Sequence, residues 1–81
     1  MAGIYEAQAV TEGGTYRAYA MIDDTIAITE DGVDGIIDFV QLDPNAPANN
    51  APEYMLQVLI SWVCEFRRGE QLLKAVLSRR H

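Results

Sequence analysis

The sequence predicts an α+β fold, in which a small antiparallel sheet of three to four strands is followed by one long or two shorter C-terminal helices packed on one face. Three observations lead to this prediction. Apolar and polar residues alternate over much of the first 42 residues, prolines and asparagines gather in residues 43–50, and residues 51–81 are apolar with helical spacing. At 81 residues the chain is one domain. Its expected parts are a β-rich acidic part (1–42), a Pro/Asn-rich loop (43–50) and a helical part (51–81).

The first two strands are predicted to form a β-hairpin. Residues 4–10 and 15–22 both alternate and are rich in Tyr, Ile and Val, as half-buried strands are. The Thr11-Glu12-Gly13-Gly14 segment between them suits a tight turn, because glycine adopts positive φ without steric cost. Asp23-Asp24 predicts the next turn, and residues 25–29 predict a third short strand.

Residues 33–42 fit two structures. On a helix, Val33, Ile36, Ile37 and Val40 would form an i, i+3, i+4, i+7 stripe. Nearby glycines and a β-branched run lower helix propensity, so we favour a fourth strand, paired with residues 25–29.

A helix-start signature follows the loop. Asn50 can act as the N-cap, Pro52 suits the first turn, and Glu53 completes a capping box and complements the helix dipole. A helix unbroken to residue 80 would be about 45 Å long, whereas a domain of this size is only about 30 Å across. The helix therefore breaks or projects towards a partner. We expect a break near Gly69, with Gly69 itself at positive φ.

The first half of this helical part is apolar on two sides. One stripe, predicted to cover the sheet, consists of Met55, Leu59, Trp62 and Phe66. We expect both Trp62 and Phe66 to be largely buried. A second stripe of Leu56, Ile60 and Val63 needs its own cover. A second helix bearing Leu72, Leu73, Val76 and Leu77, or another subunit, would provide it.

Residues that could support catalysis or bind metal are scarce. Cys64 is the only thiol and His81 the only imidazole, and 17 positions separate them, too far on a continuous helix for a dyad. One Cys and one His cannot form the usual zinc site. The acidic turn residues do not match an EF-hand loop, because Gly32 would fall at its third position. The sequence contains no phosphate-loop or hydrolase motif. We therefore expect no catalytic activity, no cofactor and no metal.

Charge is the most informative property. The formal net charge is −6, yet residues 1–50 contain nine acids and a single base, Arg17, whereas residues 51–81 contain five bases and three acids. Such a surface repels nucleic acid and anionic membranes and attracts a basic protein. The acids that crowd the predicted turns and fourth strand are the expected partner-binding residues: Asp23, Asp24, Glu30, Asp31, Asp34 and Asp38. No basic-then-apolar leader and no apolar run of about twenty residues is visible, so we expect a cytoplasmic protein.

In size, acidity and predicted architecture the chain resembles small phage- or mobile-element-encoded inhibitors of the anti-CRISPR type. The resemblance covers these general properties, not a sequence motif. It implies that carboxylates such as Asp23, Asp24 and Glu30 face a basic nucleic-acid-handling complex.

The function expected from the sequence is that of a non-catalytic protein-binding module, most concretely an inhibitor that binds such a complex through its acids without contacting nucleic acid. The alternative is a homo-oligomeric structural or assembly protein, a homodimer for example, that uses the apolar C-terminal helix as its subunit interface.

Overall fold

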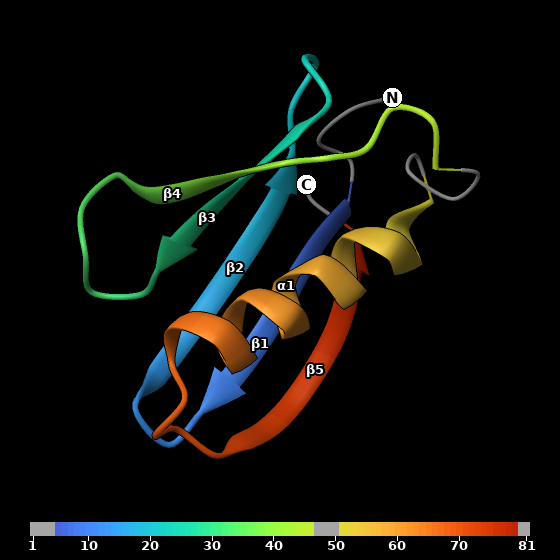
Figure 1. Cartoon of the computed structure of the whole chain (residues 1–81). Coiled ribbons are helices and arrows are strands. Elements are labelled where there is room, and N and C mark those ends of the chain that lie inside the picture. Colours follow the sequence, from blue (N-terminus) through green and yellow to red (C-terminus); the bar gives the residue numbers. More distant parts are fainter. Residues whose placement is uncertain (1–4, 47–50, 80–81) are drawn as a thin grey trace.

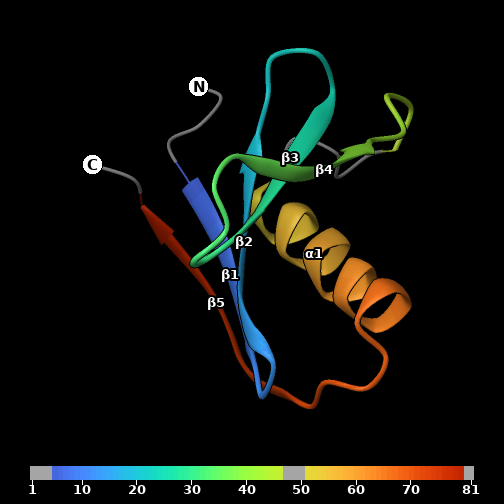
Figure 2. The ribbon, with the colours of Figure 1, turned by 90° about the vertical axis from the view of Figure 1, so that its left-hand side faces the viewer.

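The computed structural model of the chain describes residues 5–46 and 51–79. Its elements are β1 (Tyr5–Thr11), β2 (Gly14–Ala20), β3 (Thr25–Glu30), β4 (Ile36–Gln41), α1 (Pro52–Phe66) and β5 (Leu72–Arg79). The strands form one antiparallel sheet in the order β4-β3-β2-β1-β5, and α1 lies on one of its faces (Figures 1 and 2). The α+β class and the antiparallel sheet are as predicted, but the order of the C-terminal elements is not.

The predicted β-hairpin is confirmed. β1 and β2 pair from Glu6↔Tyr19 to Thr11↔Gly14. At the turn, the Thr11 hydroxyl accepts hydrogen bonds from the amides of Gly13 and Gly14, each at 3.1 Å. This side chain therefore adds local hydrogen bonds that help to hold the two-residue turn closed.

The strand interpretation of residues 33–42 is also confirmed, because β4 pairs with β3 from Thr25↔Gln41 to Thr29↔Ile36. A bulge interrupts the pairing between Ile28 and Thr29. The connecting loop contains two glycines at positive φ, Gly32 at 88° and Gly35 at 81°. These left-handed positions explain why the segment cannot continue as the amphipathic helix that its apolar spacing also allowed.

The prediction of a C-terminal helix, or of two, is wrong. The helix has 15 residues and ends at Phe66, and the chain returns as the edge strand β5, antiparallel to β1. Without β5, the main-chain groups on the outer edge of β1 would lack hydrogen-bond partners. This would be costly, because Ala7 and Ala9 in this strand are fully buried. β5 supplies those partners and places Leu77 beside Ala7 on the helix side of the sheet. Pairing of the sheet outweighs the helical spacing of residues 72–77.

The helix does break before Gly69, as expected, but not through a left-handed glycine. Its C-cap is Arg67, with φ −132° and ψ 49°, and Gly69 is not among the positive-φ glycines. At the other end, Pro52 lies in the first turn as predicted. The N-cap position is Ala51, with no side-chain capping bond, and the predicted cap Asn50 lies outside the described residues.

Small residues on the sheet allow the helix to approach closely. Ala7, Ala9 and Ala18 are each 0% exposed, and the buried helix residues pack over them. Those helix residues are Met55, Leu59, Trp62 and Val63. The prediction that Trp62 is buried is confirmed, but Phe66 is 52% exposed, so the expectation for it is wrong. Val63 is buried with the first stripe, whereas Leu56 and Ile60 are half-buried.

Candidate functional site

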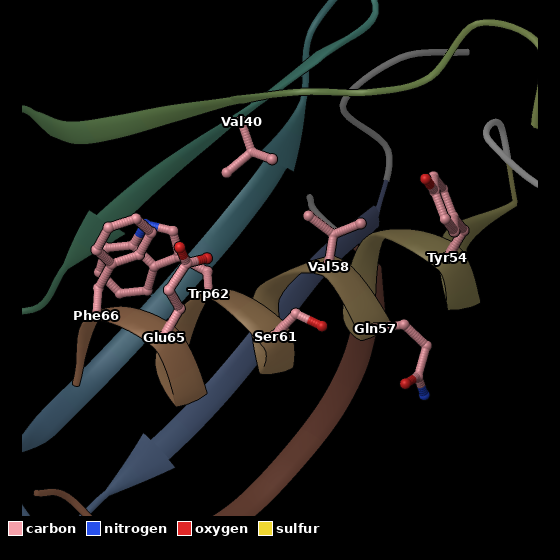
Figure 3. A pocket seen from close by; sticks show the side chains of 8 residues that line it. All are labelled: Val40, Tyr54, Gln57, Val58, Ser61, Trp62, Glu65 and Phe66. Atoms are coloured by element: carbon pink, nitrogen blue, oxygen red, sulfur yellow. The ribbon is translucent and has the colours of Figure 1, made fainter. Parts of the chain in front are cut away.

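A groove of about 310 Å³ lies between α1 and β4 (Figure 3). It exists because α1 packs chiefly over β1, β2 and β5, while β4 continues the sheet past the helix (Figure 1). Its volume falls at the lower end of the range for ligand pockets. The lining residues are Val40, Tyr54, Gln57, Val58, Ser61, Trp62, Glu65 and Phe66.

Trp62 is the one buried side chain among the residues that line this groove. It is only 5% exposed, and its indole N–H donates a 2.8 Å hydrogen bond to Oδ2 of Asp38 on β4. The rings of Tyr16 and Phe66 are both in tilted contact with it, with centroids 5.4 and 5.6 Å away. This bond links the helix to β4 across the groove, so both walls are held in place before any ligand arrives.

Phe66 supplies an apolar surface at one end of the groove. Its side chain lies beside Trp62, and 52% of it remains exposed (Figure 3). Val40 and Val58 face the same space from the strand and the helix. An apolar side chain of a partner that contacted these residues would remove exposed hydrocarbon from water, worth about 25 cal/mol per Å².

The groove is also anionic. Asp38 accepts bonds from two neutral donors, the Trp62 indole and the amide of Phe39, and Glu65 is exposed at the rim. The ion pairs among the described residues involve Arg17 and Arg67, and neither pairs with Asp38 or Glu65. Both carboxylates therefore remain without a cationic partner within the described chain, an arrangement that favours a basic ligand.

A polar cluster behind Trp62 fixes the end of α1. The Tyr16 hydroxyl lies 2.8 and 3.0 Å from the two carboxylate oxygens of Glu70 and accepts a 3.0 Å bond from Nε of Arg67. The Arg67 guanidinium lies over the Trp62 ring, 4.9 Å from its centroid. Thr11 also donates to Glu70. The cluster thus joins the hairpin turn, the helix end and the chain leading to β5.

These contacts perturb two pKa values. Burial, and then the hydrogen bond with Glu70, raises the pKa of Tyr16. The hydrogen bonds from Thr11 and Tyr16 lower the pKa of Glu70. A carboxylate held by hydroxyl donors is stabilised in its ionised form, so Glu70 acts as a structural anchor for the loop after α1.

The six acids predicted to bind a partner do not form one patch. Asp23 and Asp24 lie in the β2–β3 turn, whereas Glu30 ends β3 and Asp31 and Asp34 follow it. The length of β3 separates the two groups by about 20 Å. The sixth acid, Asp38, lies on β4 and accepts a hydrogen bond from Trp62, which lines the groove.

Two of these acids also have basic partners inside the chain. Glu30 is 3.9 Å from Arg67, and Asp31 forms a 3.0 Å ion pair with Arg17. The Arg17 guanidinium lowers the pKa of Asp31. The predicted set thus contains one acid, Asp38, that is bonded to a lining residue of the groove, and it does not contain Glu65 or the apolar walls. An acid within the apolar run Ile36–Val40 was the one sequence signal for this site.

Comparison with known proteins gives no match to a family model, to a curated protein or to a solved structure. Within the described ranges, no three His, Cys, Asp or Glu side chains are grouped so as to hold a metal ion. No helix in the described part of the chain has the length and apolar character needed to cross a membrane.

Proposed function

We propose that this protein is a non-catalytic binding module for a basic segment of another protein, and that the groove between α1 and β4 is its binding surface. The supporting observation is the combination of a pre-formed apolar groove with two carboxylates, Asp38 and Glu65, that have no ion-pair partner in the described chain. The groove offers hydrocarbon contact, hydrogen-bond acceptors and negative charge. These are binding features, and they select a ligand with an apolar anchor next to Lys or Arg.

This proposal retains the basic partner expected from the sequence. It places the contact in the groove between α1 and β4 instead of on the acidic turns. Two of the six acids are engaged by bases of the same chain, so a partner would have to compete for them. A basic partner would not have to displace a base of the same chain in order to bind Asp38 or Glu65. An inhibitor of a basic nucleic-acid-handling complex is the most concrete form of this function, and an exposed basic loop of such a complex would be the ligand.

The homo-oligomeric alternative has less support. It relied on the second apolar stripe of the helix, Leu56, Ile60 and Val63, needing a cover from another subunit, and Val63 is already buried in the chain's own core. Only Leu56 and Ile60 of the second stripe remain half-buried.

A display selection of random twelve-residue peptides tests the proposal. The bait is the wild-type protein, and the enriched peptides are then tested against Val58→Glu, which places a charge in the apolar wall. We expect enriched peptides to combine apolar residues with Lys or Arg, and to bind Ser78→Glu as tightly as wild type, because Ser78 is exposed on β5, away from the groove. Enrichment of acidic peptides, or equal binding to Val58→Glu, would contradict the proposal.

A further inference from the structure

We propose that the basic segment binds in an extended conformation, as a sixth strand on the free edge of β4, with alternate side chains entering the groove. This inference rests on the proposed function and specifies its ligand. It follows from three features of β4: its position in the sheet, its charge and the two faces that it presents.

β4 is an edge strand. It is the last strand in the sheet order, and within the described chain it pairs only with β3. The amide of Phe39 donates a 2.8 Å bond to Oδ1 of Asp38, the side chain of its own neighbour. An exposed edge of this kind is a template for a further strand, whose main-chain bonds supply affinity while the alternating side chains supply specificity.

Charge distinguishes the two edges of the sheet. β5, the other edge, contains Lys74 and Arg79 and no acid. β4 contains Asp38 and follows Asp34, and the sequence has no Lys or Arg between Arg17 and Arg67. A basic strand is therefore repelled from β5 and attracted to β4, which selects one edge out of two.

The pairing defines a side-chain pattern for the ligand. Val40 and Asp38 pair with Ile26 and Ile28, which belong to the buried core, so they share the helix side of the sheet; Phe39 is on the opposite face and 56% exposed. Residues directly opposite in antiparallel strands point to the same side. The ligand residue opposite Val40 should therefore be apolar, and the one opposite Asp38 should be Lys or Arg. Between them, opposite Phe39, a β-branched or aromatic residue fits best.

Asp38 links backbone pairing with charge recognition. Its Oδ2 is used by the Trp62 indole, while its Oδ1 accepts from Phe39. If an incoming strand accepts the hydrogen bond of the Phe39 amide, Oδ1 becomes available to the ligand's Lys or Arg. The Trp62 bond can persist throughout, so the groove wall is maintained.

The probe is a synthetic ten-residue peptide of alternating Val and Thr, with a Lys two positions from the central Val, titrated against the full chain. Trp62 is the only tryptophan, so its fluorescence reports on the groove. Two N-methylated versions of the peptide are compared, each blocking every second amide. In antiparallel pairing, only every second amide of the peptide faces β4. The version in which these amides are methylated should therefore bind at least about tenfold more weakly, and the other version should bind as the unmethylated peptide does.

Two measurements on the protein complete the test. Amides of β4 should exchange more slowly with solvent when the peptide is bound, and amides of β5 should be unchanged. Asp38→Asn, which retains an oxygen for the Trp62 indole, should weaken binding about tenfold, whereas Glu12→Gln at the distant hairpin turn should not.

The outcomes separate the two proposals. If the selection on wild type enriches no peptide and the Val/Thr peptide does not bind, the proposed function fails. If the peptide binds, Val58→Glu abolishes binding, and both N-methyl series bind equally, the groove is the site but strand addition is wrong. A helical ligand in the groove would give that second result. Protection of β5 in place of β4 would also overturn the inference.

Discussion

At the scale of single residues, Trp62 connects the stability of the fold with the groove. It contacts Tyr16, Phe66 and the Arg67 guanidinium, and it donates to Asp38. Phe66 is one turn further along the helix and is half exposed. The two aromatic residues should therefore respond differently to truncation, although their spacing in the sequence is that of a single buried stripe.

We predict that Trp62→Ala lowers the free energy of unfolding by about 3–5 kcal/mol, as loss of a buried aromatic side chain does. Phe66→Ala should cost about 1 kcal/mol or less, because half of the side chain is already in water, yet it should weaken peptide binding. Chemical denaturation measures the first effect and peptide titration the second. Equal destabilisation by the two changes would contradict the burial described for the helix.

The glycines offer a second contrast. Gly69 has ordinary φ, and a Cβ there would meet nothing within 4 Å, whereas Gly32 has φ +88°. We predict that Gly69→Ala is neutral or stabilises by up to about 1 kcal/mol, since it restricts the unfolded chain. Gly32→Ala should destabilise by about 1 kcal/mol, because L-residues disfavour the left-handed region. Thermal denaturation of both variants checks this, and a destabilised Gly69→Ala would show strain at that position.

Glu70 makes the stability depend on pH. Its hydrogen bonds lower its pKa in the folded state, so the unfolded chain binds the proton more readily. The stabilisation is present at neutral pH and is lost as the pH falls below about 5 through the folded pKa. Asp31, whose pKa Arg17 lowers, acts in the same direction. In Glu70→Gln the midpoint of thermal unfolding should therefore fall less between about pH 6 and 3 than in wild type, and an unchanged slope would contradict the role of this cluster.

At the scale of elements, the sequence predicts what is local and fails where the outcome depends on distant pairing. The hairpin follows from two alternating runs around Gly13-Gly14, and the start of α1 from Pro52 and Glu53. Residues 72–79 carry apolar side chains at spacings that suit either a helix or a strand. What decides for a strand is the open edge of β1, some sixty residues earlier in the chain.

Two leucines of β5 differ in burial although they lie four positions apart. A helix or a regular strand would place both on one face, but β5 has a register shift opposite Val10 and Thr11, where Leu73 is the extra residue. In the strand, Leu77 packs against the core beside Ala7, and Leu73 is 59% exposed. We predict that Leu77→Ala costs about 2 kcal/mol and Leu73→Ala less than about 0.5 kcal/mol. Equal losses in urea denaturation would contradict this difference in burial.

At the scale of the whole molecule, the fold separates acidic side chains that are close together in the sequence. The acids crowded between residues 23 and 38 separate to the two ends of β3 and to the groove, and Arg17 and Arg67 neutralise two of them. Spacing along the chain could not show this, because it depends on which strands pair. The groove itself was equally hidden, since it arises from β4 extending past a helix that covers the other side of the sheet.

Binding of a basic segment in the groove between α1 and β4 can be followed by the fluorescence of Trp62. The basic Val/Thr peptide is titrated against wild type, Val58→Glu and Ser78→Glu at about 50 and 500 mM salt, a range over which the Debye length falls roughly threefold. We expect saturable binding to wild type and Ser78→Glu that weakens as salt rises, and at least about tenfold weaker binding to Val58→Glu. Affinity that is the same for all three proteins, or unaffected by salt, would contradict binding of a basic segment in the groove.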